Sequence, residues 1–456
     1  MPYIPHTDAD RTEMLATIGV SSIDDLFREI PANLLVKPGE LKIPGALDEA
    51  RLFSHLRDLS QTNVSAADVV CFLGAGIYDR FIPASVGAVI SRGEFLTSYT
   101  PYQPEASQGY LQSIYEFQTM VAELYGMDMA NASMYDGSTA MAEAALMAVG
   151  IQKRDKVAVS AGVHPSYRQV LDCYAWALGI EVVTIPTQDG KTAQYDSAKG
   201  CACVVVQSPN FFGQIESLAV SRSAATDHGA LLVVVSDPVA NALIKPPGAY
   251  GADIVVGEGQ PMGIAMGFGG PLLGLFACKK EFVRQIPGRI VGRTSEVHGD
   301  REGYVMTLRT REQDIRREKA TSNICTNEAL MALAATVYMC AMGKNGMKQI
   351  ATSTVRNTQY TIQALTKAGG KLKFPGSVFG EFVLEMPGDA VEVRNSLLKK
   401  GILGGLPLGD FYPEMGSCLL VAVTEMRTRD EIDRYAVALA EILAERTMPV
   451  LDGVPS

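Results

Sequence analysis

The chain has 456 residues, of which 47% are apolar and 20% are charged, and its formal net charge is −10. This composition is typical of a globular protein and excludes a largely disordered chain. An acidic chain without a basic stripe is not expected to bind nucleic acid. The length predicts about two or three domains, with a core large enough to need neither disulfides nor a metal.

The cysteines and the N-terminal residues bear on the cell compartment. Eight cysteines are scattered through the sequence, and the close pair, Cys201 and Cys203, has no second pair nearby as a zinc site requires. We therefore expect free thiols and no metal. The N-terminal residues lack a secretory signal, and the longest apolar run, at 329–343, is shorter than the about 18 residues of a membrane span. A cytoplasmic protein that does not contact a membrane is predicted.

Residues 1–65 predict a helical arm outside the main body of the protein. Asp8 and Asp10 are placed to cap one helix, and the sequence at 47–60 has the apolar spacing of an amphipathic helix. Prolines and glycines between them predict a loop.

The segment from Thr97 to Glu105 predicts a pre-ordered loop that faces a ligand. It packs two tyrosines, two prolines, a glutamine and a glutamate into nine residues. Proline restricts the backbone, and tyrosine and glutamine form directed hydrogen bonds. An ordinary packed loop is the alternative interpretation.

The middle of the sequence alternates between helix and strand patterns. A helix is expected at 107–126, followed by short runs of valine and isoleucine that predict strands buried on both faces. Segments of helical character lie between several of these strands, which favours a mostly parallel sheet with right-handed crossovers. Residues 66–300 are therefore predicted to form one large α/β domain. The strand sequences are KVAVS, EVVTI, CVVVQ, LLVVV and DIVV.

Beyond residue 300 the pattern changes to long helices at about 311–367, followed by shorter strands and helices. This predicts a smaller C-terminal α+β domain at 301–456. Four arginines, interleaved with acidic residues, indicate a salt-bridged helix face, and the polar stretch at 321–326 is a candidate contact with a neighbouring subunit. The arginines are Arg309, Arg311, Arg316 and Arg317.

Gly137, Ser138 and Thr139 follow Asp136 and come directly before an apolar helix. The first turn of a helix offers free N–H groups and a positive dipole, so this position suits a phosphate or a carboxylate. A plain helix cap is the alternative.

Two further residues lie where parallel strands end, which is where open α/β sheets bind ligands. His164 follows one strand and could stack on a planar cofactor, and Asp237 follows another and could pair with a pyridinium nitrogen. Each also has a local interpretation, His164 as a helix cap and Asp237 as a turn residue before Pro238. Phosphate cradle, stacking histidine and acidic strand end, in that order, are the layout of aspartate-aminotransferase-like enzymes, which use pyridoxal phosphate (PLP).

That layout also needs a lysine to hold PLP covalently, near the end of the strand that follows Asp237. No lysine occurs from Pro246 to Cys278, and Lys245 comes too early in the sequence. The pattern therefore indicates a cofactor pocket that has lost its covalent anchor.

Longer motifs carry a more specific pattern: FLTSYTPYQPEASQGYLQSIYEFQTM, YDGSTAMAEA, VVVQSPNFFG, GFGGPLLGLFA, IPGRIVG and TREQDIRREKATSNICTNEAL. In this order they resemble the glycine cleavage system P-protein family, the glycine decarboxylases, from about residue 1 to 445. The family occurs as one chain with two homologous halves or as two subunits, and this chain is similar to the N-terminal half, subunit 1. In the family only the other half carries the PLP lysine, and here Gln260 occupies its place.

The resemblance implies an aspartate-aminotransferase-like (fold type I) structure and an enzyme that is active only with a partner, glycine decarboxylase subunit 2, which holds PLP covalently. Glycine would lose CO2 there, and its aminomethyl group would pass to the lipoyl arm of H-protein. Loop residues expected to cross the interface and position glycine or the lipoyl group are Ser98, Tyr99, Tyr102 and Glu105. Residues expected to contact the partner's cofactor phosphate are Thr321, Ser322 and Asn323. The vestigial pocket comprises Gly137, Ser138, Thr139, His164, Asp237 and Gln260.

Two alternatives stay open at this point. One is a purely structural or regulatory subunit of that complex, and the other is a self-sufficient PLP enzyme, such as a desulfurase or aminotransferase, that uses Lys245. A tetramer of two plus two subunits is the natural closed assembly for the family interpretation.

Overall fold

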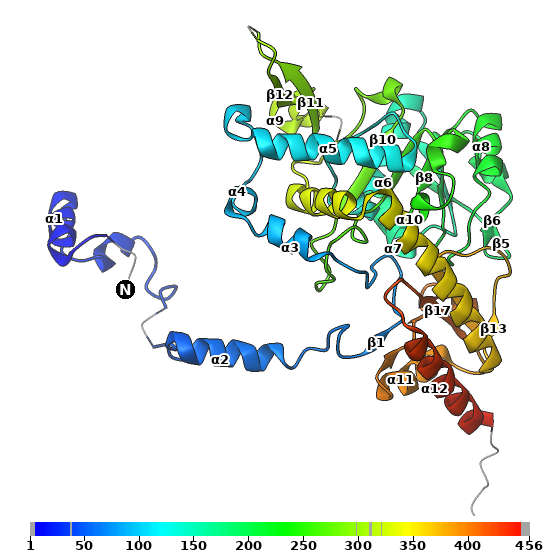
Figure 1. Cartoon of the computed structure of the whole chain (residues 1–456). Coiled ribbons are helices and arrows are strands. Elements are labelled where there is room, and N and C mark those ends of the chain that lie inside the picture. Colours follow the sequence, from blue (N-terminus) through cyan, green and yellow to red (C-terminus); the bar gives the residue numbers. More distant parts are fainter. Residues whose placement is uncertain (1–4, 37–38, 298, 310–311, 321, 448–456) are drawn as a thin grey trace, which may run out of the picture. The chain divides into compact units, whose positions relative to one another are not determined.

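The computed structural model of the chain (Figure 1) forms two units, Met1–Val64 and Ser65–Ser456, each considered by itself. In the first unit, helix α1 (Asp8–Ile18) begins at a capping box of Thr7 and Asp10 and ends at Gly19 in the left-handed conformation. Helix α2 (Glu49–Ser60) is capped by Asp48. None of the described residues of this unit is buried. The structure describes residues 5–36, 39–297, 299–309, 312–320 and 322–447.

A seven-stranded sheet is the centre of the second unit, in the order β2-β10-β9-β8-β7-β3-β4. The five strands from β9 to β4 are parallel, whereas β10 is antiparallel to both of its neighbours. The prediction of a mostly parallel α/β sheet is thus confirmed, and KVAVS, EVVTI, CVVVQ and LLVVV are strands over their full predicted length. The bounds are β2 (Met129–Ala130), β3 (Lys156–Ser160), β4 (Glu181–Ile185), β7 (Cys203–Gln207), β8 (Leu231–Val235), β9 (Ile254–Glu258) and β10 (Gly274–Cys278).

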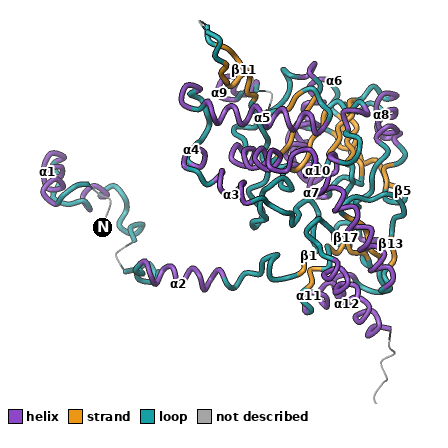
Figure 2. Tube along the Cα trace, in the orientation of Figure 1, coloured by secondary structure: helices purple, strands orange, loops and turns teal. Residues whose placement is uncertain are grey.

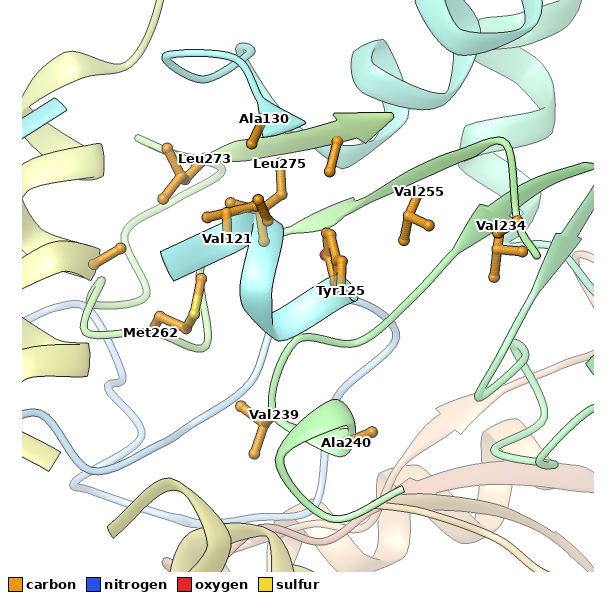
Figure 3. Close-up of a cluster of buried hydrophobic side chains, with 14 of the residues drawn as sticks. Val121, Tyr125, Ala130, Val234, Val239, Ala240, Val255, Met262, Leu273 and Leu275 are labelled. Atoms are coloured by element: carbon orange, nitrogen blue, oxygen red, sulfur yellow. The ribbon is translucent and has the colours of Figure 1, made fainter. Parts of the chain in front are cut away.

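Helices cover both faces of this sheet, as continuous apolar strands require. Successive strand residues point to opposite sides, so Val204 and Val206 join one buried cluster and Val205 joins the other. The first cluster packs under α5 (Gln108–Tyr125), α8 (Leu218–Asp227) and α10 (Ala329–Lys367); Figure 3 shows Val121 and Tyr125 of α5 beside Val234 and Val255. The second cluster packs under α6 (Gly137–Gln152) and α7 (Pro165–Leu178).

The C-terminal part forms a four-stranded antiparallel sheet in the order β13-β14-β17-β16 (Figure 2). The predicted boundary at residue 300 falls inside the hairpin of β11 (Ile290–Ser295) and β12 (Glu302–Thr307). Strand β1 (Val70–Cys71) also pairs with β15 (Ile402–Leu403), far along the chain. The division into two domains at 66–300 and 301–456 therefore remains a prediction from the sequence. The remaining bounds are β13 (Lys371–Leu372), β14 (Glu381–Glu385), β16 (Leu406–Pro407), β17 (Cys418–Ala422), α11 (Ala390–Lys399) and α12 (Arg429–Thr447).

The expectation of long helices throughout 311–367 is only partly met. A short helix α9 (Gln313–Arg316) is followed by a 3-10 turn at Arg317–Lys319, and the long helix α10 begins at Ala329 and is interrupted at Gly343. Short polar residues such as those at 322–326 hydrogen-bond to nearby backbone and favour turns over helix. The basic run is therefore not one helix face, and Arg311 lies outside the described residues. Other small elements are α3 (Ala84–Ile90), α4 (Gly93–Leu96), β5 (Thr187–Gln188) and β6 (Lys191–Thr192).

Within the described residues, no helix is long and apolar enough to cross a membrane. No group of three or more histidine, cysteine or acidic side chains in that same part of the chain is arranged to hold a metal ion. None of the eight cysteines, all of which lie within the described residues, forms a disulfide bond.

A glycine controls how closely the loop after β7 approaches the C-terminal sheet. Gly213 has a left-handed φ of 78°, and a Cβ added there would overlap the backbone carbonyl of Glu381 on β14. We expect Gly213→Ala to lower the free energy of unfolding in urea by about 2 kcal/mol or more, because a backbone clash cannot relax by side-chain rotation. Gly150→Ala in α6 is the matched control, since nothing lies within 4 Å of its added Cβ. Equal effects of the two substitutions would contradict this prediction.

Candidate functional site

The carboxyl ends of four parallel strands meet at a small cavity. His164 follows β3, Gln207 ends β7, Asp237 follows β8 and Glu258 ends β9, and all four side chains line a cavity of about 50 Å³. The sheet topology thus brings His164 and Asp237 together, as expected from their places after parallel strands. Glu381 of β14 lines the same cavity, so the C-terminal sheet closes it.

The first turn of α6 is held by two carboxylates. The side chain of Asp136 accepts hydrogen bonds from the Thr139 N–H at 2.9 Å and from the hydroxyls of Ser138 and Thr139. The Gly137 N–H donates to Glu258 at 2.9 Å. Burial raises the pKa of Glu258 to about 7, against the opposing effect of three backbone N–H donors. The predicted phosphate cradle is therefore occupied by the chain's own acidic groups.

His164 is a helix cap with a stacked aromatic neighbour. Its Nδ1 accepts from the Ser166 N–H at 3.1 Å, which leaves the protonated Nε2 to donate to the Ala75 carbonyl at 2.8 Å. Burial lowers the pKa of His164, which favours this neutral form. The ring of Tyr167 stacks on the imidazole, with 5.0 Å between ring centroids and 27° between the planes. The face on which a planar ligand could stack is thus covered.

Asp237 and Glu381 both accept hydrogen bonds at the cavity wall. One oxygen of Asp237 accepts from the N–H groups of Val239 at 2.7 Å and Ala240 at 3.2 Å, as its turn interpretation predicts. Glu381 accepts from the Ala75 N–H at 2.7 Å and from the Tyr78 hydroxyl at 2.8 Å. Burial raises the pKa of Glu381 to about 7.

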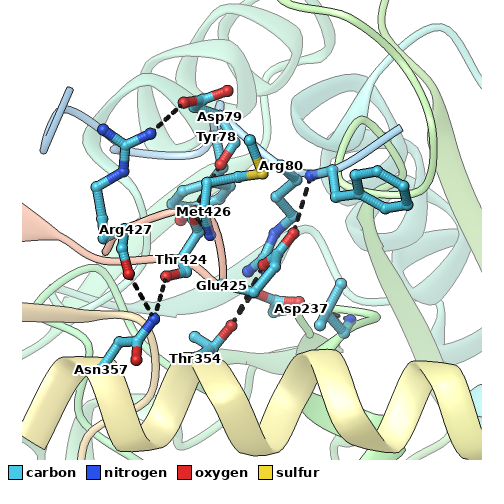
Figure 4. Close-up of polar contacts among 12 residues, drawn as sticks. Tyr78, Asp79, Arg80, Asp237, Thr354, Asn357, Thr424, Glu425, Met426 and Arg427 are labelled. Atoms are coloured by element: carbon cyan, nitrogen blue, oxygen red, sulfur yellow. Dashed lines mark hydrogen bonds and ion pairs between the residues drawn. The ribbon is translucent and has the colours of Figure 1, made fainter. Parts of the chain in front are cut away.

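A buried ion pair fixes the loop that carries Tyr78 into the cavity. Arg80 lies 2.7 Å from Glu425 and is 3% exposed, and it also donates to Thr354 of α10. Figure 4 shows this pair beside Asp237, with Arg427 paired to Asp79. Because the pair joins the loop before α3, the long helix and the chain after β17, it holds three distant segments around one wall.

The two positions that bear on a covalent amine, Gln260 and Lys245, are not among the described residues that line the cavity. Gln260 is 2% exposed; its amide nitrogen donates to the carbonyls of Tyr78 at 3.0 Å and Ile264 at 2.8 Å, and its oxygen accepts from the Tyr78 N–H. Lys245 is exposed and holds its ammonium over the Tyr250 ring, 4.3 Å from the centroid. The described cavity lining contains no lysine.

The predicted 97–105 loop presents its polar side chains to solvent. Tyr99 is 79% exposed and Tyr102 is 45% exposed, Glu105 is exposed, and Ser98 is half-buried. These side chains do not line the cavity described above. They form a separate surface, available to a partner.

Arg289 connects this loop to the polar segment before α10. Its guanidinium, 6% exposed, donates to the Tyr102 hydroxyl at 3.2 Å, the Cys325 carbonyl at 2.7 Å and the Thr326 hydroxyl at 3.2 Å. The guanidinium of Arg309 lies over the Tyr102 ring, 4.8 Å from its centroid. Two predicted site segments, about 200 residues apart in sequence, therefore share one buried arginine.

Two of the three residues predicted to contact a phosphate are described, and Thr321 lies outside the described residues. The Ser322 hydroxyl accepts from the Ile324 N–H at 3.0 Å and also hydrogen-bonds to the buried carboxyl of Glu143. Asn323 is exposed and accepts from Gln313 at 3.0 Å. Burial raises the pKa of Glu143 to about 7.

Four residues of these two regions were not identified from the sequence: Tyr167, Glu258, Glu381 and Arg289. Tyr167 lies three residues after His164, on the same face of a helix, which is a signal that could have found it. Glu258 lies only two residues before Gln260, at the end of an apolar strand, so its position in the sequence was also a signal. It is buried, and a buried polar side chain needs hydrogen-bond partners. Nothing local in the sequence indicates the contacts of Glu381 or Arg289.

Comparison with known proteins identifies relatives over nearly the whole chain. The family model described as glycine cleavage system P-protein matches residues 1–439. A protein of Anoxybacillus flavithermus named probable glycine dehydrogenase (decarboxylating) subunit 1 is 51% identical over 443 residues, covering 96% of this chain and 98% of its own. A protein of the same name from Desulforamulus reducens is 50% identical, covering 97% of this chain and 100% of its own.

Solved structures agree with this result. A crystal structure of glycine decarboxylase (P-protein) of the glycine cleavage system, in inhibitor-bound form, matches with a TM-score of 0.90 and 44% identity, covering 97% of this chain and 100% of that one. A cysteine desulfurase from Thermococcus onnurineus matches with a TM-score of 0.60 at 17% identity, over 85% of this chain and 98% of its own, which shows a shared fold. The fold is that of the fold type I PLP-dependent enzymes.

The position of Glu381 predicts a pH-dependent stability. Its pKa is about 7 in the folded chain against an ordinary 4.5. Because the pKa of Glu381 is higher in the folded chain than in the unfolded chain, its contribution to the free energy of unfolding is greatest below about pH 4.5. This contribution is lost as the pH rises through 7. Relative to Glu381→Gln, the wild type should lose about 3 kcal/mol of unfolding free energy across that window.

A control on the same strand should behave in the opposite sense. The hydrogen bond from Lys373 lowers the pKa of Glu385, so its contribution to stability is present above the ordinary pKa and is lost on acidification. Urea denaturation of both glutamine variants between pH 4 and 8 provides the comparison. If the difference in unfolding free energy between the wild type and Glu381→Gln does not change with pH, burial does not raise the pKa of Glu381.

The bonds of Arg289 predict coupled loss of order in two segments. We expect Arg289→Ala to speed amide hydrogen exchange at both 97–105 and 322–327 by about tenfold or more, since hydrogen bonds to a charged group contribute about 1.5–3 kcal/mol. Arg293→Ala is the control, because Arg293 lies nearby on strand β11 but is exposed and pairs with Glu302 at the surface. Acceleration in one segment without the other would show that Arg289 does not link them.

Proposed function

The chain belongs to the glycine cleavage system P-protein family, and from that premise we propose that it is subunit 1 of a two-subunit glycine decarboxylase. The complete enzyme decarboxylates glycine, releases CO2 and transfers the remaining aminomethyl group to the lipoyl arm of H-protein. Its formal class is glycine dehydrogenase (decarboxylating), the name that the relatives carry.

One observation carries the proposed division of work between subunits. The position expected for a PLP lysine is Gln260, whose amide is fully engaged with backbone groups, and the described cavity lining offers no amine. The cofactor is therefore held by a second, lysine-bearing subunit, and this chain carries no covalent step. Such a division explains why this P-protein chain has the fold of a PLP enzyme but lacks the lysine that binds PLP covalently.

The contribution of this chain is to position groups across the subunit interface. Four side chains of the 97–105 loop contact glycine or the lipoyl group. The exposed Tyr99 and Tyr102 use their hydroxyls, the half-buried Ser98 is a donor, and the exposed Glu105 is an acceptor or a partner for a cation. Ser322 and Asn323 belong to the segment that Arg289 ties to the same loop through the Cys325 carbonyl. We place them toward the partner's cofactor phosphate, with Thr321 as the third residue of that proposal.

The assembly is proposed to be a tetramer of two plus two subunits in the cytoplasm. A closed symmetric arrangement of two homologous subunits is the economical form. Eight cysteines without a disulfide bond among them suit a reducing compartment. The alternative of a self-sufficient enzyme using Lys245 has no support from its position, because that side chain is exposed and packs on Tyr250.

Isotope exchange between labelled bicarbonate and the carboxyl group of glycine tests the proposed activity. The purified chain alone should show no exchange, and activity should appear only when the lysine-bearing subunit and lipoylated H-protein are added. Exchange by this chain alone would make it an enzyme in its own right. Full exchange by the other subunit without this chain would make it dispensable for catalysis.

Loop substitutions in the reconstituted enzyme separate a positioning role from a purely structural one. Tyr99→Phe and Glu105→Gln each remove one polar function at constant size, and each should lower the exchange rate by about tenfold, the loss of one directed hydrogen bond in the reacting complex. Glu94→Gln is the control, because Glu94 is exposed just before the loop and pairs only with Arg92. If all three variants match the wild type, the chain acts as a structural or regulatory subunit.

A further inference from the structure

We propose that the chain fills its own cofactor pocket: Tyr167 lies where the ring of PLP would lie, and acidic side chains occupy the place of its phosphate. The missing lysine is then only one of three barriers to binding. This inference rests on the proposed function in one respect: it takes this cavity to correspond to the cofactor pocket of a PLP-dependent relative.

The place of the ring is taken by an aromatic side chain of this chain. Tyr167 stacks on His164, the residue expected to stack on a planar cofactor, and its hydroxyl extends to the start of α6, where a Cβ on Gly137 would collide with it. Phe211 packs edge-on against the same imidazole, 4.8 Å between centroids. One side chain therefore spans the distance from the stacking residue to the phosphate position.

The place of the phosphate is taken by carboxylates. Asp136 and Glu258 accept four hydrogen bonds from the start of α6. The donors are the N–H groups of Gly137 and Thr139 and the hydroxyls of Ser138 and Thr139. A phosphate would have to displace these acceptors from the same donors, and it would carry its own negative charge into their vicinity. The N–H groups of Gly137 and Thr139 thus have acceptors without a ligand.

The place of the amine is closed as well, and little space is left. Gln260 uses both ends of its amide on backbone groups and is 2% exposed. The remaining cavity of about 50 Å³ has room for a few water molecules. Pockets for small ligands and cofactors measure about 300–1,000 Å³. The residues present therefore do not fit PLP.

Restoring the lysine alone should consequently fail. In Q260K the new amine would meet a closed pocket, so incubation with PLP and borohydride should give no pyridoxyl adduct at position 260. Q260K/Y167F removes the hydroxyl but keeps the ring and should behave in the same way. Q260K/Y167A/E258Q removes the ring and one carboxylate and should give an adduct at position 260, in at least tenfold higher yield.

The chemistry of the readout is simple. The lysine amine condenses with the aldehyde of PLP, one water leaves, and borohydride transfers hydride to the C=N bond, so that peptide mapping locates the adduct. The full chain is used, alone and mixed with the lysine-bearing subunit, whose own adduct maps to different peptides. Wild-type activity and partner dependence do not enter this comparison, so its outcome is independent of the proposed function.

Two results would overturn the proposal. One is an adduct at position 260 in Q260K in the same yield as in the triple variant, which would mean that the lysine was the only barrier. The other is a folded triple variant that forms no more adduct than Q260K. If melting curves show that the triple variant does not fold, Q260K/Y167A against Q260K/Y167F makes the same test, and equal yields would again overturn it.

Discussion

In the first turn of α6, the N–H groups of Gly137 and Thr139 and the hydroxyls of Ser138 and Thr139 donate to the carboxylates of Asp136 and Glu258. Because these donors are already used, the described part of the pocket has no free site for the phosphate of a cofactor. A helix start that points into the end of a parallel sheet is an anion site unless something else satisfies it. Here Glu258 at the end of strand β9 supplies one acceptor, and Tyr167 covers the same turn. The fold of a cofactor-binding enzyme is thereby kept while its ligand is replaced by side chains.

With that pocket closed, the groups suited to chemistry lie on a different surface. The 97–105 loop and the segment before α10 are both tied to Arg289, a buried arginine whose guanidinium donates hydrogen bonds to four residues: Tyr102, Cys325, Thr326 and Asn327. Such an arrangement orders exposed tyrosines without burying them, which is what a residue acting on a neighbouring subunit's substrate requires. The proposed division of work between this chain and a lysine-bearing partner rests on these two regions together.

The predictable parts of this structure are those in which local pattern decides the outcome. Runs such as LLVVV can only be buried strands, and residues after parallel strands must meet, so the proximity of His164 and Asp237 followed from topology. The direction of the Tyr167 ring depends on a rotamer and on its neighbours, and the partners of Arg289 come from segments far apart in sequence; neither is encoded locally. Helix was expected over about 311–367, whereas residues 322–328 are not helical, because short polar residues such as Ser322 and Asn323 favour turns.

The most direct measurement is a titration of the isolated wild-type chain with PLP, followed by its visible spectrum, borohydride reduction and peptide mapping. The account predicts no absorbance band of protein-bound cofactor and no single modified lysine. A stoichiometric adduct on one lysine, Lys245 or any other, would contradict it, because the chain would then hold the cofactor that its closed pocket should exclude.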